Sequence, residues 1–129
     1  MACWVTMSNP QILELRLDGN IPSKKNSRIN RGDGKSFPSK KYMDWEEDAL
    51  KQTRLQTRLR FIKPVSVEVI IYFGTNTRAD LDNRLTSILD MLVEGVVLKD
   101  DKWQDVPIIL AQAEHRPRKP GAFVRITEL

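Results

Sequence analysis

Two aspartates separated by one residue lie in the segment "TRADLDNR", residues 77–84. An extended pattern precedes this segment and a helical pattern follows it. Inside an α-helix Asp80 and Asp82 would diverge by about 200°, but an N-cap Asp80 would fold its side chain over the first turn, where Asp82 lies. The two carboxylates can then converge. The pair predicts either a capped helix start or a site for a hard metal ion, and on local pattern alone capping is favoured.

A further pair of carboxylates follows in the charged turn at Asp100 and Asp101. If the chain returns there to the helix start, Asp80, Asp82 and Asp101 form a three-carboxylate site. Mg²⁺ binds to one or two carboxylates together with water and phosphate oxygens, and Mn²⁺ suits the same ligands. Such an ion can orient and activate a water molecule and stabilise charge on a phosphodiester. The reaction class that this set predicts is phosphodiester hydrolysis.

Several strands are expected to support these residues. Residues 12–19 alternate apolar and polar side chains, and the β-branched run 65–73 is typical of a central strand. A short extended piece at 96–98 precedes the charged turn. Residues 106–117 and 122–129 then look like two strands of a hairpin-like pair.

Two helices complete the expected fold. The first runs from Ser39 or Asp44 to about Arg60, and the second from Asp80 to Val93, where Gly95 stops it. Their apolar stripes consist of Trp45, Ala49, Leu55 and Leu59 in the first helix and of Leu81, Leu85, Ile88, Leu89 and Leu92 in the second. The order of elements predicts an α+β fold, a single domain over residues 1–129 with a mixed β-sheet covered by two main helices.

Composition narrows the class of protein. The 129 residues suit one domain, and no apolar run approaches the roughly 18 residues of a membrane span. The start of the chain has no secretory pattern, so a soluble, cytoplasmic protein is expected. One cysteine, Cys3, excludes an internal disulfide and a thiolate metal cluster, while one histidine, His115, excludes chemistry built on several histidines.

Basic residues are concentrated in the first half of the chain. Residues 1–63 carry 13 Lys/Arg against 7 Asp/Glu, whereas residues 64–129 carry 8 against 10. The segment 20–41 is a long basic loop interrupted by proline and glycine, and long cations in such a loop can reach successive phosphates. The residues expected to contact DNA are Lys24, Lys25, Asn26, Arg28 and Arg78. A solvated basic loop is the alternative, and the cluster Arg116–Lys119 is more typical of a soluble loop tip.

At these residues the sequence resembles the RusA-type Holliday junction resolvases, small endodeoxyribonucleases of bacteria and their phages. The resemblance rests on "DLDN" at 80–83, on the apolar helix ending in "ILDMLVEGVVLKDD" at 88–101, and on "IPSKKNS" at 21–27. It covers roughly residues 12–115. The resemblance implies a homodimer that resolves four-way DNA junctions in recombination and repair, with Asp80, Asp82 and Asp101 binding divalent metal and carrying catalysis.

One position departs from the pattern of that family. The family often has a lysine three residues after the asparagine of DLDN, and this chain has Thr86 there. Lys99 or Lys102 are the candidates for a replacement. Three hypotheses follow: a Mg²⁺-dependent endonuclease for branched DNA, a branched-DNA-binding protein that does not cleave, and a structural domain whose aspartates only cap a helix and keep the surface soluble.

Overall fold

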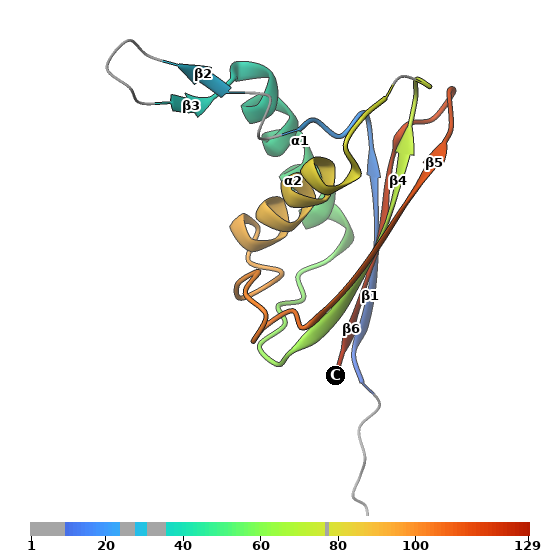
Figure 1. Cartoon of the computed structure of the whole chain (residues 1–129). Coiled ribbons are helices and arrows are strands. Elements are labelled where there is room, and N and C mark those ends of the chain that lie inside the picture. The colour runs from blue at the N-terminus through green and yellow to red at the C-terminus, as the bar shows by residue number, and fades with distance from the viewer. Residues whose placement is uncertain (1–9, 24–27, 31–35, 77) are drawn as a thin grey trace, which may run out of the picture.

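A mixed four-stranded β-sheet forms one layer, and two helices cover one of its faces (Figure 1). The computed structural model describes residues 10–23, 28–30, 36–76 and 78–129. In chain order the elements are β1 (Ile12–Asp18), β2 (Arg28–Asn30), β3 (Ser36–Pro38), α1 (Lys40–Gln56), β4 (Val65–Phe73), α2 (Leu81–Glu94), β5 (Ile108–His115) and β6 (Gly121–Glu128). The predicted α+β class, a mixed sheet with two main helices, is confirmed.

The strand order of the sheet is β1-β6-β4-β5, with β4 and β5 parallel and the other neighbours antiparallel. The predicted hairpin-like pair of β5 and β6 is therefore wrong, because β4 lies between them. The connection 116–120 steps across the end of β4, where the Arg116 N–H donates to the carbonyl of Phe73 at 2.8 Å. Five residues easily span two strand spacings of about 4.8 Å each, so the short connection did not require adjacent strands.

The core lies between the sheet and the helices. Alternate residues of β4 point into it, and Val65, Val67, Val69 and Ile71 are all buried. The stripe of α2 packs against them, with Ile88 and Leu92 fully buried. These two predicted faces are confirmed, since periods of 2 and 3.6 residues each bring one apolar face to the same interior.

The apolar face of α1 differs from the predicted one. Tyr42, Ala49 and Thr53 are its buried residues, whereas Leu55 is 89% exposed. The helix ends at Gln56, so the predicted end near Arg60 is also wrong, and Leu59 lies beyond the helix.

The side of α1 that faces the edge of β1 carries glutamines, and not the leucines of the predicted stripe. The amide of Gln56 accepts from the Arg16 N–H at 2.8 Å and donates to the Arg16 carbonyl at 2.6 Å. Gln52 makes the equivalent pair of hydrogen bonds with Asp18 at 2.8 and 3.2 Å. This face of α1 is polar because it satisfies backbone groups of β1, which has no neighbouring strand on that side within the part of the chain that the structure describes.

The basic segment 20–41 contains more regular structure than predicted. Its strands β2 and β3 form a small antiparallel pair, separate from the main sheet, and α1 begins at Lys40. The hairpin extends away from the sheet (Figure 1).

The turn that carries Asp100 and Asp101 is fixed by the end of α2. Val97 N–H donates to the Leu92 carbonyl and Val96 N–H to the Val93 carbonyl, both at 3.0 Å, which is the Schellman arrangement. The residue in the left-handed conformation is Val96, with a φ of 62°, and not the neighbouring Gly95. The predicted extended piece 96–98 forms only an isolated bridge, between Leu98 and Phe61.

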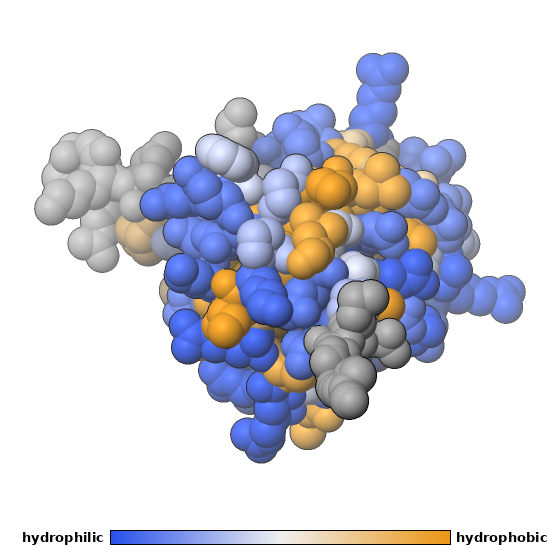
Figure 2. Space-filling model, turned by 90° about the horizontal axis from the view of Figure 1, so that it is seen from below, coloured by the Kyte–Doolittle hydropathy of each residue, from blue (hydrophilic) through white to orange (hydrophobic). Residues whose placement is uncertain are grey.

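Some apolar side chains remain on the surface. Three consecutive residues of the edge strand β5, Ile108, Ile109 and Leu110, are 41–61% exposed. Seen from below, the molecule shows several apolar patches within a mainly hydrophilic surface (Figure 2). Across the described residues, no helix is long and apolar enough to cross a membrane.

Candidate active site and nucleic-acid interface

Asp80 and Asp82 meet at the start of α2 through Asn83. Asp80 is the N-cap residue, yet its side chain makes no capping hydrogen bond. Instead its Oδ2 accepts from the side-chain amide of Asn83 at 3.1 Å, while Oδ1 of Asp82 accepts from the backbone N–H of Asn83 at 3.0 Å. One residue thus binds both carboxylates, and both remain exposed to solvent. The sequence carries no signal for this role of Asn83 beyond its place in DLDN.

An N-cap aspartate ordinarily accepts a hydrogen bond from the N–H of the second or third helical residue. Asp80 has the extended backbone of a cap, with φ −80° and ψ 120°, but leaves its carboxylate turned to Asn83. Helix capping alone therefore does not account for this side chain. A carboxylate oriented by an amide donor and open to solvent keeps lone pairs for a cation.

Thr86 is occupied by the helix itself, because its hydroxyl donates to the Asp82 carbonyl at 3.0 Å. It supplies no cation near the carboxylates. Of the two lysines considered as replacements, Lys102 lies 3.7 Å from Asp100 and Lys99 is exposed. Both belong to the turn after α2, not to its start.

Asp101 lies in a second acidic region at the other end of α2. It lines a groove of ≈ 470 Å³ together with Glu46, Asp90, Glu94 and Asp100. Asp90 and Glu94 lie late in the sequence of α2, where carboxylates are typical of a solvated helix face. The structure brings both to the groove of Asp101, because residues 90 and 94 follow one another by one helical turn.

Partial loss of solvent, followed by the hydrogen bond with Asp100 and the charge of Asp90, raises the pKa of Asp101. The pKa of Asp100 is lowered, chiefly because its Oδ1 accepts the Asp101 N–H at 2.7 Å. Asp101 therefore carries its charge at a cost that a nearby cation would offset.

The three predicted ligands are not assembled at one point. Asp82 and Asp90 are eight residues apart on α2, or about 12 Å along its axis, and Asp101 lies near Asp90. Within the described ranges, no group of three or more His, Cys, Asp or Glu side chains is placed to hold a metal ion. The pair Asp80 and Asp82 does suit Mg²⁺ chemically, since this ion binds one or two carboxylates and keeps several waters.

Of the residues predicted to contact DNA, Lys24, Lys25 and Asn26 lie outside the described residues. Arg28 begins β2, and Arg78 is exposed two residues before Asp80. Arg78 makes no ion pair with Asp80 or Asp82 within the described chain, so its charge remains available for an external anion.

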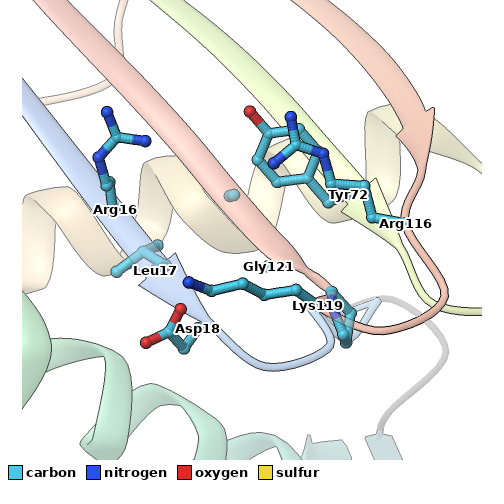
Figure 3. Close-up of a pocket in the computed structure, with 9 residues that line it drawn as sticks. Arg16, Leu17, Asp18, Tyr72, Arg116, Lys119 and Gly121 are labelled. Carbon is cyan, nitrogen blue, oxygen red and sulfur yellow. The ribbon is translucent and has the colours of Figure 1, made fainter.

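A further basic cluster lies on the sheet face that the helices leave uncovered. The guanidinium of Arg116 covers the Tyr72 ring at 3.8 Å from its centroid, and Arg116 also lies 3.6 Å from Glu114. Figure 3 shows Arg16 and Lys119 around the same small cavity. Arg116 is thus held against the sheet and does not extend from a free loop tip.

An α+β domain with an exposed, oriented pair of aspartates and with basic residues in the neighbouring loops is typical of proteins that process nucleic acids. The family model of endodeoxyribonuclease RusA matches residues 18–127, and the chain belongs to this family. Membership makes it an endodeoxyribonuclease of the kind that acts on Holliday junctions. The resemblance drawn from DLDN and the following helix is confirmed. No curated protein matches the chain.

Proposed function

We propose that this chain is a Mg²⁺-dependent endonuclease that resolves four-way DNA junctions as a homodimer, in recombination and repair in the cytoplasm. Asp80, Asp82 and Asp101 are its proposed metal ligands and catalytic carboxylates. The observation that carries the proposal is the Asn83 bridge, which orients Asp80 and Asp82 without neutralising them. When bound, Mg²⁺ or Mn²⁺ would supply an activated water and offset charge on the scissile phosphate.

The protein's own residues have separate parts in this proposal. Asn83 holds the Asp80 and Asp82 carboxylates in place before the substrate arrives. Asp101 has to approach them from the turn after α2, where partial burial, the hydrogen bond with Asp100 and the charge of Asp90 raise its pKa, and a bound cation would offset the cost of its charge. Arg78, with the predicted contacts Lys24, Lys25, Asn26 and Arg28, would grip phosphates on either side of the cleaved bond.

Homodimer formation is supported by the edge strand β5. Among the described residues β5 pairs with β4 on one side and with no strand on the other, and its Ile108, Ile109 and Leu110 are exposed. An exposed apolar edge strand favours association with another chain. Among the aromatic residues, Trp103 is the candidate for an interface because it is 74% exposed, whereas Phe61 is buried in the core and Trp45 packs against it.

A nicking assay tests this function. The protein is incubated with a synthetic four-way junction, a duplex and a single strand, each with Mg²⁺, with Mn²⁺ or with EDTA. We expect paired nicks in the junction with either metal and none with EDTA. Nicking that persists in EDTA contradicts the metal-dependent mechanism. Binding of the junction without nicks in either metal supports the non-cleaving alternative. That alternative is motivated by Thr86, which stands where the family often has a lysine and whose hydroxyl bonds to the Asp82 carbonyl.

A further inference from the structure

A cavity of ≈ 310 Å³ lies beside the start of α2, between α1, α2 and the sheet. Its walls come from the chain that leaves β1 (20–23), from the end of β4 and the residues that follow it (71–75 and 78–79), and from one side chain of each helix. Figure 1 shows these segments converging at the upper end of the molecule. It is distinct from the groove of Asp101 and from the cavity in Figure 3.

The charges around this cavity all have one sign. It is lined by Lys41 of α1, by Arg78 of the segment before α2 and by Arg84 of α2, and none of its described lining residues is a carboxylate. Within the described chain, none of these three side chains makes an ion pair. Cations of like charge repel one another around a common space, and an anion between them would offset this repulsion.

Arg84 gives the second indication. Its Nε is buried and has no hydrogen-bond partner. Arg84 follows Asp80 by four residues and so lies on the same side of the helix, yet it pairs with neither carboxylate of the acidic site. An arginine that is half-buried and lacks an acceptor within the described protein is suited to an acceptor from outside, and its planar fork matches phosphate oxygens.

The walls of the cavity are fixed by contacts within the chain. The buried hydroxyl of Ser87 donates to the Pro22 carbonyl at 2.7 Å and ties the segment after β1 to α2. On the other side Gly74 approaches Asn20 so closely that an added Cβ would lie 3.3 Å from its Oδ1. A preformed cavity lowers the ordering cost of binding a ligand.

From these observations we propose that Lys41, Arg78 and Arg84 form a binding site for a phosphodiester of the DNA backbone, next to the phosphate at Asp80 and Asp82. The proposal rests on the proposed function for its choice of DNA as ligand. Arg84 follows Asp80 by four residues, or about 6 Å along the helix axis, so the site would hold a phosphate close to the scissile one. Ser23 of the cavity wall is followed directly in the sequence by Lys24 and Lys25, which are among the residues predicted to contact DNA.

The test measures binding of a four-way junction without divalent metal, over a series of salt concentrations. Arg84→Gln and Lys41→Gln each remove one charge from the cavity, from two different helices. Arg60→Gln is the matched control, an exposed arginine next to Phe61, whose N–H bonds to Val97 beyond the opposite end of α2. We expect each cavity variant to weaken binding about tenfold and to reduce the slope of log affinity against log salt by about one, whereas the control changes both only slightly.

Equal behaviour of Arg84→Gln, Lys41→Gln and Arg60→Gln would overturn the proposal, as would a wild-type protein that does not bind the junction. Inorganic phosphate supplies the second arm, followed by amide chemical shifts of Gly74 and Thr75. If phosphate shifts them while the cavity variants bind DNA like wild type, the site serves a free phosphate and the backbone assignment is wrong. Failure of the wild-type protein to bind the junction overturns both proposals, whereas loss of metal-dependent cleavage alone leaves this result intact, because nicking is not measured.

Discussion

Replacing Asn83 by alanine tests whether the acidic pair needs its bridge. The change removes the side-chain bond to Asp80 at 3.1 Å and leaves the backbone bond to Asp82 at 3.0 Å in place. An exposed hydrogen bond to a carboxylate contributes about 0.5–1.5 kcal/mol, and about 1.36 kcal/mol of barrier changes a rate tenfold. If this energy serves to orient Asp80, the rate of nicking falls about 2- to 12-fold.

The assay is single-turnover nicking of a four-way junction with saturating protein and Mg²⁺, so that weaker DNA binding does not enter the rate. Thr86→Ala is the matched control, because it removes a 3.0 Å bond to the backbone carbonyl of Asp82 from the same helix and touches neither carboxylate. Circular dichroism checks that both variants are folded. The reasoning is refuted if Asn83→Ala nicks at the wild-type rate, or no more slowly than Thr86→Ala.

Three further predictions concern stability. Val96→Gly relieves a left-handed valine that costs about 1–2 kcal/mol, so the free energy of unfolding in urea should rise by about 1 kcal/mol after the entropy of glycine is deducted, and an unchanged value would contradict the strain. The pKa of Asp101 is raised from 3.8, so the folded state binds its proton more tightly and stability falls as pH rises from 3.8 through the folded-state pKa. Asp101→Asn should remove this fall in the melting temperature measured against pH. Parallel profiles for the variant and the wild type would contradict this prediction. Gly121→Ala brings a Cβ to 2.0 Å from the Leu17 carbonyl, and we expect a loss of about 1–3 kcal/mol by urea unfolding, with wild-type stability as the contrary result.

The parts of the fold with a strong hydrophobic period were predictable from sequence. The alternation of β4 and the stripe of α2 each describe one buried face, and both lie where they were expected. Strand order was not predictable, since the 116–120 connection is long enough to cross β4 as well as to join adjacent strands. The polar side of α1 was missed because Gln52 and Gln56 bind the edge of β1, a tertiary contact that no local pattern reveals.

The candidate site was predictable in its residue types more than in its geometry. The position of Asp80 as N-cap residue followed from the sequence, whereas the turn of its carboxylate toward Asn83 did not. The proximity of Asp90 to Asp101 depends on how the chain returns after α2, which is set by the Schellman end at Val96. Metal binding by Asp80, Asp82 and Asp101 stays a prediction.

The most direct test of this proposed metal-dependent mechanism is nicking of a four-way junction in Mg²⁺ by Asp82→Asn beside Asp44→Asn. The control removes an exposed aspartate from the first turns of α1, where it pairs only with Lys40 at 3.0 Å among the described residues. We expect Asp82→Asn to bind the junction and to lose nicking by at least about 100-fold, as for loss of a group acting in the transition state, while Asp44→Asn nicks normally. Nicking by Asp82→Asn at the wild-type rate would contradict the account.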